Sequence, residues 1–381
     1  MLVEKHISIE GNHKLSGEIN VKGAKNAVLK EMILPILSEG KYVLTNVPLI
    51  ADVQYMQDVL EVLGINSTFQ DDALEIETPS HIGIEAPYEI VQKMRASIII
   101  LGPLLARCGE ARIAFPGGDQ LGPRPVQMHL DALEKMGANF ELDHGVLIGK
   151  TDGLNGVEIN LPYASVGATE NVLLAAVLAK GRTVIENAAR EPEIVDIANM
   201  LIKMGANIIG AGTSEIIIEG VEKLAPTNHE IIGDRIVAGT FLAAILSTKG
   251  SGKINGINPE HLPMEIKKLN EMGAKIETNS TSILTENVYD QRFQWIPEVQ
   301  RMGANIQTGW QHAMIKGVKR LSGAPVHATD IRTGASLIIA ALQADGFSTI
   351  SGIDHINRGY EDIVMSLSSL GGVIEYNNND G

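Results

Sequence analysis

The sequence predicts an α/β protein of two domains, each built from three repeated helix–strand units. A helix-like segment ends six times in the phrase apolar-Gly-small and continues into an alternating run typical of a strand, at Gly64, Gly137, Gly205, Gly273, Gly303 and Gly371. These glycines lie 73, 68, 68, 30 and 68 residues apart. A fixed period marks units that bury their apolar faces against one another. The length of 381 residues exceeds the roughly 250 to 300 at which a single core stops growing, so the repeats are expected to divide between two domains.

The first half of a repeat is a helix, a glycine turn and a strand. Segments of this kind occupy residues 26–46, 96–115, 170–187, 235–256 and 335–352. Nearly all of their helices are apolar all round, which predicts burial on every side, and the glycine after each helix suits a left-handed C-terminal cap. The second half is a polar loop, an amphipathic helix and a strand, as in residues 187–212, and all six repeats contain it.

The fifth repeat is 38 residues shorter than the 68-residue period. It begins directly at residues 285–309, with no buried-type helix between Gly273 and Thr285, so one helix–strand half is missing between 274 and 285. A buried helix of about 15 residues contributes several large side chains, each worth about 1.5 to 3 kcal/mol on burial. The second domain is therefore expected to be weakened, since the net stability of a domain is small.

Composition excludes several classes of protein. The net charge of -15 opposes nucleic acid and anionic membranes as partners, and 44% apolar residues support sizeable cores. No basic start precedes an apolar signal core, and the longest apolar run, residues 96–106, is shorter than the ~20 residues that span a bilayer. The chain is expected in the cytoplasm. Its single cysteine, Cys108, is expected to be a buried spacer and not a nucleophile.

Motifs for nucleotide hydrolysis and zinc chemistry are absent from the sequence. There is no Walker loop, no His-Glu-x-x-His and no pair of cysteines, so no metal and no cofactor are expected. The ten histidines are scattered, and we expect His129 and His327 to be structural.

Charged residues recur where the buried-type helices begin. Lys25 and Asn26 stand at one predicted helix start, Arg95 at another, and Asp330 with Arg332 at the last. Helix N-termini present free amides and the positive end of the helix dipole, so they bind anions. Taken singly, each residue is also explained as a capping or surface charge. The recurrence at matching repeat positions favours an anion site.

The loop at residues 115–130 is the most informative of the connections. Three glycines and three prolines within residues 116–125 predict an extended, turn-rich segment that can act as a lid. It carries Asp119 and Arg124, the acid and the cation that proton transfer onto an anionic substrate needs. The alternative is a solvated surface loop with an unrelated ion pair.

Several motifs together resemble those of the enolpyruvyl transferases: GAKNA, MRAS, PGG followed four residues later by PRPV, SVGATEN, ENAAREPEIVD, DRI with GTF, ATDIR and NRGYE. The resemblance is greatest to the UDP-N-acetylglucosamine branch and covers essentially the whole chain apart from the gap. It implies a two-domain inside-out α/β barrel of six repeats, with sheets around the buried helices and the active site between the domains. Residues 23–232 would form the domain with the lid loop 115–125, and residues 1–22 plus 233–381 the other.

The resemblance also implies an activity. The enolpyruvyl group of phosphoenolpyruvate would pass to the 3-hydroxyl of UDP-N-acetylglucosamine with release of phosphate, the first committed step of peptidoglycan synthesis. These two small molecules are the expected partners, and the chain is expected to be a monomer or a weak homo-oligomer. Phosphoenolpyruvate carries a phosphate and a carboxylate, so its site must concentrate cations.

The residues that match the family's site positions fall into three groups. The catalytic group implied by the resemblance is Asp119, Lys25, Asn26, Arg358 and Asp330. The phosphoenolpyruvate group is Lys25, Arg95, Arg124, Arg292, Arg332 and Arg358. The UDP-sugar group is Asn26, Arg95, Arg124, Pro125, Val126, Ser165, Val166, Gly167 and Val288.

Two departures from the family pattern leave alternatives open. Most members use a cysteine in the lid where this chain has Asp119, and a carboxylic acid with a raised pKa can also donate the proton. The Asp that usually serves as acceptor base belongs to the missing half-repeat, so no residue here inherits its role. A catalytically impaired paralogue that binds the sugar nucleotide is one alternative. A transferase for another acceptor nucleotide is a second, suggested by Gln127, where members usually carry an acid.

The lid substitution generates a prediction about inhibition. We expect the protein to resist the epoxide antibiotic fosfomycin, because Asp119 lacks the soft sulfur nucleophile that the epoxide alkylates. After incubation with the antibiotic, peptide mass spectrometry should find residues 115–130 unmodified. Covalent labelling of Asp119 would overturn this expectation.

Overall fold

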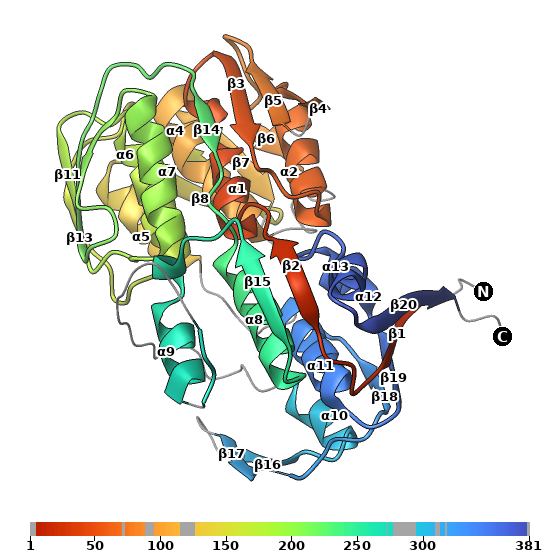
Figure 1. The fold of residues 1–381 in the computed structure, drawn as a ribbon. Helices are drawn as coiled ribbons and strands as arrows, with labels where there is room; N and C mark the ends of the chain where they lie inside the picture. The colour runs from red at the N-terminus through yellow and green to blue at the C-terminus, as the bar shows by residue number, and fades with distance from the viewer. Residues whose placement is uncertain are drawn as a thin grey trace. The chain divides into compact units, whose positions relative to one another are not determined.

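The structure, a computed structural model, describes residues 5–70, 73–87, 95–114, 126–271, 273–276, 295–308, 313–316 and 318–378. The chain divides into two compact units, Gly23–Ile232 and Met1–Lys22 with Gly233–Gly381, called here the 23–232 unit and the 233–381 unit (Figure 1). The chain therefore passes between the units twice, at residues 22–23 and 232–233. No helix in the described part of the chain is long and apolar enough to cross a membrane.

The described strands of the 23–232 unit form three four-stranded sheets with a shared pairing pattern. In each sheet one edge strand runs parallel to its neighbour, and the other two pairings are antiparallel. The orders are β14-β3-β5-β4, β6-β7-β9-β8 and β10-β11-β13-β12. The strands are β3 (Gly40–Thr45), β4 (Asn66–Gln70), β5 (Ala73–Thr78), β6 (Glu85–Ala86), β7 (Glu110–Ala114), β8 (Asn139–Asp143), β9 (Val146–Lys150), β10 (Glu158–Asn160), β11 (Arg182–Glu186), β12 (Asn207–Ile209), β13 (Glu215–Glu219) and β14 (Asn228–Glu230).

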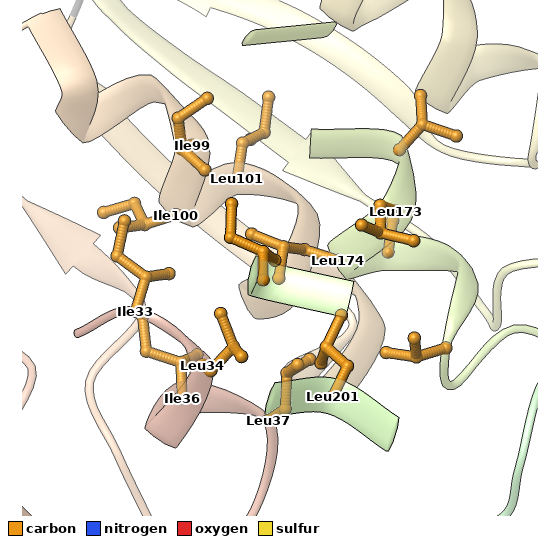
Figure 2. Close-up of a cluster of buried hydrophobic side chains, with 14 of the residues drawn as sticks. Ile33, Leu34, Ile36, Leu37, Ile99, Ile100, Leu101, Leu173, Leu174 and Leu201 are labelled. Carbon is orange, nitrogen blue, oxygen red and sulfur yellow. The ribbon is translucent and has the colours of Figure 1, made fainter. Parts of the chain in front are cut away.

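Helices from all three repeats meet in the core of this unit. The described helices are α1 (Lys25–Glu31), η1 (Leu34–Leu37), α2 (Ala51–Val62), η2 (Arg95–Ile100), α4 (Leu101–Cys108), α5 (Gln127–Lys135), α6 (Val166–Ala176) and α7 (Pro192–Lys203). Figure 2 shows side chains of η1, η2, α4, α6 and α7 in one buried cluster, among them Leu34, Ile100, Leu101, Leu174 and Leu201. Every residue of α6 from Ala168 to Ala176 is buried, as the apolar pattern predicted.

The α4 helix ends as its sequence predicts, with a correction to its last residue. Gly109 caps the helix in the left-handed conformation, with φ at 73°, and donates its backbone N–H to Leu105 at 3.1 Å. Cys108, just before this cap, is exposed, so the expectation of a buried spacer was wrong. The buried stripe of α4 ends at Leu105, one turn earlier. Partial burial nevertheless raises the pKa of the Cys108 thiol, which disfavours the reactive thiolate.

The 233–381 unit also contains the first strands of the chain, which lie in Met1–Lys22. Strand β1 (Lys5–Glu10) lies between β19 (Phe347–Ser351) and β20 (Val373–Asn378), antiparallel to both, in the sheet β18-β19-β1-β20. Strand β18 (Pro325–His327) runs parallel to β19. Two two-stranded sheets complete the described strands: β2 (Ser16–Asn20) with β15 (Ser251–Asn255), in parallel, and β16 (Asn305–Thr308) with β17 (Ala313–Lys316), antiparallel.

The apolar helix α8 (Arg235–Ser247) of this unit is less buried than its sequence predicted. Its fully buried residues are Ala238, Phe241, Ala244 and Ile245, while Ile236 is 47% exposed. Side chains of α8 are therefore less completely covered than those of α6. The other described helices are η3 (Pro259–His261), α9 (Pro263–Glu271), α10 (Ile296–Arg301), α11 (Ile331–Gln343), α12 (Ile353–Asn357) and α13 (Ile363–Ser369).

The contrast between α6 and α8 predicts unequal costs for one substitution. Leu174→Ala, at a fully buried position of α6, should lower the opening free energy of that helix by about 2 to 5 kcal/mol. Leu242→Ala, at a partly exposed position of α8, should cost less than half as much, because fewer contacts are lost. Native-state hydrogen exchange measures each helix separately. Equal losses in the two helices would contradict the prediction.

Candidate active site

The start of α1 is held by a buried carboxylate. Lys25, the first residue of α1, places its Nζ 2.6 Å from Oδ2 of Asp52 in the first turn of α2. The Lys25 side chain is 16% exposed and that of Asp52 is 3% exposed. A short charge-assisted contact of this kind fixes a long side chain in one direction. The structure thus confirms the predicted helix start at Lys25 and Asn26, and adds Asp52 as its neighbour.

A second cation of α1 connects this helix to α6. Lys30 Nζ donates a hydrogen bond to the backbone oxygen of Asn26 at 2.8 Å and lies 3.3 Å from Oε1 of Glu170. The side chains of Lys30 and Glu170 are 11% and 1% exposed. Burial raises the pKa of Glu170 to about 7, although the nearby Lys30 opposes the shift. The first turn of α1 is therefore tied to a carboxyl group near the start of α6.

Three residues of the predicted UDP-sugar group lie at the start of α6. Ser165 is the N-cap, and its Oγ accepts a hydrogen bond from the backbone N–H of Ala168 at 3.3 Å. Val166 begins the helix. Gly167 packs against His129 of α5, because a Cβ at this position would lie only 3.1 Å from the His129 Cε1. Only glycine fits here without moving the ring.

The His129 side chain is buried and structural, as expected. Burial lowers its pKa to about 4, so the ring is neutral at physiological pH. Its Nδ1 lies 3.0 Å from Nδ2 of Asn171, the donor in this contact. His327, in contrast, is exposed, and its Nδ1 contacts the Ser351 hydroxyl at 2.9 Å.

The Asn171 side chain joins α6 to the segment that begins with Arg95. Its Oδ1 accepts from the Gly102 backbone N–H at 2.7 Å, and its Nδ2 donates to the Ile98 oxygen at 3.1 Å. Asn171 is fully buried. A Cβ at Gly102 would lie 2.5 Å from this Oδ1, so the approach requires glycine. The backbone three residues after Arg95 is thus fixed, while the side chain of Arg95 lies outside the described part.

In the 233–381 unit, Asp330 caps α11. Its Oδ1 accepts the backbone N–H groups of Arg332 at 2.8 Å and Thr333 at 3.1 Å, and its Oδ2 accepts the Thr333 hydroxyl at 2.6 Å. Burial by itself would raise the pKa of Asp330, but the hydrogen bonds from Thr333 and Arg332 outweigh it and lower the pKa below its ordinary value. The predicted helix start at Asp330 is confirmed, and its carboxyl is a stable anion.

Three sequence motifs of this unit converge near the start of α11. Arg358 follows α12, and the next residue, Gly359, packs so closely on Ile331 that a Cβ would lie 2.9 Å from the Ile331 Cγ2. The Tyr360 hydroxyl lies 2.8 Å from the Thr240 hydroxyl on α8. Burial raises the pKa of Tyr360 to about 12, so this hydroxyl stays protonated. NRGYE, ATDIR and GTF are therefore neighbours in the fold.

Five predicted site residues lie outside the described residues: Asp119, Arg124, Pro125, Val288 and Arg292. Val126, half-buried, is the N-cap residue of α5 and packs against the core. No motif of the sequence pointed to Asp52, Lys30, Glu170 or Asn171 individually as site residues. The available signal was the position of Lys30, Glu170 and Asn171 next to apolar runs in predicted buried helices, because such residues are seldom buried without a partner.

One group in the described residues has the spacing of a metal site. Glu31, Asp196 and His229 are buried, with ligand atoms within 4.8 Å of one another. However, Lys203 Nζ lies 3.1 Å from His229 Nδ1 and can only donate to it, which places the imidazole proton on Nε2. That Nε2 is 2.9 Å from Asp196 Oδ1 and donates to it. No imidazole lone pair then faces the carboxylates, so the group fits a proton-sharing network better than a cation.

Comparison with known proteins decides the family. A family model described as EPSP synthase (3-phosphoshikimate 1-carboxyvinyltransferase) matches residues 9–286 and 277–367. The chain belongs to the enolpyruvyl transferase family. Its relatives include the UDP-N-acetylglucosamine 1-carboxyvinyltransferase of Nocardia farcinica, 43% identical over 414 aligned positions that cover 96% of this chain and 97% of the relative. The protein of the same name from Thermotoga maritima is 42% identical, with 97% and 98% covered.

Solved structures of enolpyruvyl transferases share the α/β fold of this chain. The enolpyruvyl transferase NikO from Streptomyces tendae matches with a TM-score of 0.86 at 22% identity, covering 99% of both chains. An EPSP synthase from Acinetobacter baumannii matches with a TM-score of 0.74 at 20% identity, covering 98% of this chain and 100% of that one.

The buried network in this enolpyruvyl transferase predicts opposite pH responses of two variants. Burial, followed by the nearby Asp196 carboxylate, raises the pKa of Glu31 well above 4.5, so the folded protein loses stability as the pH rises above that value. Glu31→Gln removes this loss, and its melting temperature relative to the unsubstituted protein should increase between pH 4.5 and pH 8. A variant that is less stable than the unsubstituted protein at pH 8 would contradict the prediction.

Asp196→Asn is the matched control. Burial alone would raise the pKa of Asp196, but hydrogen bonds from His229, Glu31 and the Ile232 backbone lower it below 3.8. Its contribution to stability is present above pH 3.8 and is lost as the pH falls through the folded-state pKa. Asp196→Asn should therefore cost about 1.5 to 3 kcal/mol at neutral pH and less in acid.

Proposed function

We propose that this protein transfers the enolpyruvyl group of phosphoenolpyruvate to the 3-hydroxyl of UDP-N-acetylglucosamine and releases phosphate. The observation that carries the proposal is the 40 to 43% identity, over at least 96% of the chain, to proteins named UDP-N-acetylglucosamine 1-carboxyvinyltransferase. The reaction is the committing step of peptidoglycan synthesis.

The proposed roles follow the charge of the donor. Lys25, Arg124 and Arg358 bind its phosphate, and Arg292 and Arg332 face its carboxylate. Asp330 orients these guanidinium groups or stabilises the cation that develops, a role that suits the lowered pKa of its carboxyl. Asn26 contacts the UDP-sugar and helps to hold the tetrahedral intermediate, and Arg95 contacts both substrates. Ser165, Val166 and Gly167 hold the uracil beside Pro125 and Val126, and Val288 contacts the sugar.

The chemistry is an addition followed by an elimination. Asp119 protonates the methylene carbon of phosphoenolpyruvate while the sugar hydroxyl adds to the neighbouring carbon and passes its proton to substrate phosphate or water. A proton then leaves the new methyl group as the C–O bond to phosphate breaks, which restores the double bond. The donor site stabilises the tetrahedral intermediate between the two steps by hydrogen bonds and positive charge.

We further propose that each unit is a three-repeat domain of an inside-out barrel and that the fifth repeat is truncated. Three findings support the truncation. The family model matches the chain in two separate stretches, which overlap at residues 277–286, next to the proposed gap. Among the described strands, β16 and β17 pair only with each other, whereas the β18-β19-β1-β20 sheet has four strands. Only four of the 13 residues of the apolar helix α8 are buried.

The truncation also supports a second candidate, a catalytically impaired paralogue that binds the sugar nucleotide. The missing half-repeat is the segment that would supply the acceptor base. In that case the protein would bind UDP-N-acetylglucosamine without turnover. A third candidate, another nucleotide as acceptor, is suggested by Gln127, whose Nε2 donates to Asp131 at 2.6 Å.

Phosphate release separates these candidates. The proposed enzyme should release phosphate from phosphoenolpyruvate only when UDP-N-acetylglucosamine is present, and mass spectrometry should find the enolpyruvyl ether. Asp119→Ala should lower kcat by about 10² to 10⁴, the usual contribution of a general acid. Glu77→Ala, which removes an exposed carboxylate, should leave kcat unchanged. Calorimetric binding of the nucleotide without phosphate release would favour the impaired paralogue.

A further inference from the structure

We propose that Lys30 and Glu170 are positioning residues for the donor site, which lock the start of α1 to the nucleotide-binding start of α6. The proposal rests on the proposed function, since it concerns how Lys25 and Asn26 are held for that reaction. Neither residue is expected to touch a substrate. Their role is to set the distance and direction between two loops that must act on the two substrates together.

The geometry supplies a continuous connection between the loops. Lys30 lies one turn after Asn26 and donates to its backbone oxygen at 2.8 Å. The same ammonium group reaches Glu170 Oε1 at 3.3 Å. Glu170 stands in α6, whose first residues, Val166 and Gly167, belong to the predicted UDP-sugar group. A single buried ion pair therefore spans the interval between the two substrate loops.

The α1 helix needs an outside anchor at its start. It has seven residues, and its N-cap, Ala24, provides no side-chain hydrogen bond. Helices this short are not stable on their own, so tertiary contacts determine their position. Lys25 is held by Asp52 on one side. Lys30 and Glu170 fix the backbone of the same turn from within the core.

Stability alone does not account for the pair. Burying two charges costs about as much free energy as their attraction returns, and apolar residues of similar size are often equal or better. The neighbouring positions of α6, Val172 to Ala176, are all apolar and buried, so an apolar residue at 170 would suit the core. The charged pair is instead explained by a need to hold α1 and α6 in one defined geometry relative to each other.

The titration of Glu170 provides a readout that a merely structural role would not move. Its pKa is raised to about 7 by burial, and the charged groups that face it are Lys30 of α1, Glu193 of α7 and Glu191 just before α7. Below pH 7 the carboxyl is protonated and the ion pair is lost. As the pH rises through 7 the pair forms, so the alignment of Lys25 and Asn26 should improve.

Steady-state kinetics between pH 6 and 8.5 test the proposal. Lys30→Met should lower kcat by about 10-fold to 100-fold, the cost of a small misplacement of reacting groups, with a smaller change in either KM. Glu170→Gln keeps an oxygen for Lys30 and should retain most of kcat at pH 6. However, its kcat relative to the unsubstituted enzyme should fall as the pH rises through 7. Lys41→Met, which breaks an exposed ion pair with Glu77, is the control and should match the unsubstituted enzyme throughout.

Hydrogen exchange gives a test that does not depend on turnover. UDP-N-acetylglucosamine, bound at the start of α6, should slow amide exchange in residues 25–31. In Lys30→Met this ligand-induced protection should vanish, while the exchange rates of α7 should stay those of the unsubstituted protein. A folded Lys30→Met variant with normal kcat and normal protection overturns the proposal, as does a Glu170→Gln variant with an unchanged pH profile. An unsubstituted protein that releases no phosphate overturns the proposed function instead, and the exchange experiment still decides this inference.

Discussion

A helix that is buried on every side must find a partner inside the protein for each polar group it carries, and α6 carries three in succession. Thr169 accepts the Ala189 backbone N–H at 3.0 Å, Glu170 pairs with Lys30, and Asn171 binds the backbone at Ile98 and Gly102. Unpaired, each would cost free energy comparable to a lost hydrogen bond or more. Because the three partners lie on different elements, satisfying α6 also fixes the loop before α7, the start of α1 and the η2–α4 junction.

In the 233–381 unit, helix caps fix the positions of the helix starts. Asp234 and Asp330 accept the first free amides of α8 and α11, and the Tyr360 hydroxyl contacts Thr240 of α8. Side-chain caps of this type hold a helix start in one orientation. In both units several of the described residues with candidate roles therefore lie at helix starts that short polar contacts hold in place. The surrounding apolar core supplies the stability, and the caps supply the direction.

The sequence predicted much of this from period and turn chemistry. Gly109 correctly predicted a helix end and Asp330 a helix start, because a left-handed glycine cap and an N-terminal carboxylate cap each depend only on neighbouring residues in the sequence. The partners of Lys25 and Asn171 could not be predicted, since Asp52 and Gly102 are brought to them by tertiary packing alone. The partial exposure of α8 was also not predicted, because burial of a helix depends on tertiary packing. An apolar sequence shows that a helix is hydrophobic but not how completely other parts of the protein cover it. The exposure of Cys108 was not predicted, because the sequence does not show that the buried face of α4 ends at Leu105, before the last turn of the helix.

The strand order of the 233–381 unit has a consequence for biosynthesis. Residues 5–10 complete their sheet only with β19 and β20, which are translated more than 300 residues later. Since domains tend to fold as they leave the ribosome, residues 23–232 can acquire their core while the opening strand still waits for its partners. Until β19 and β20 have been made, the backbone groups of that strand lack their native partners.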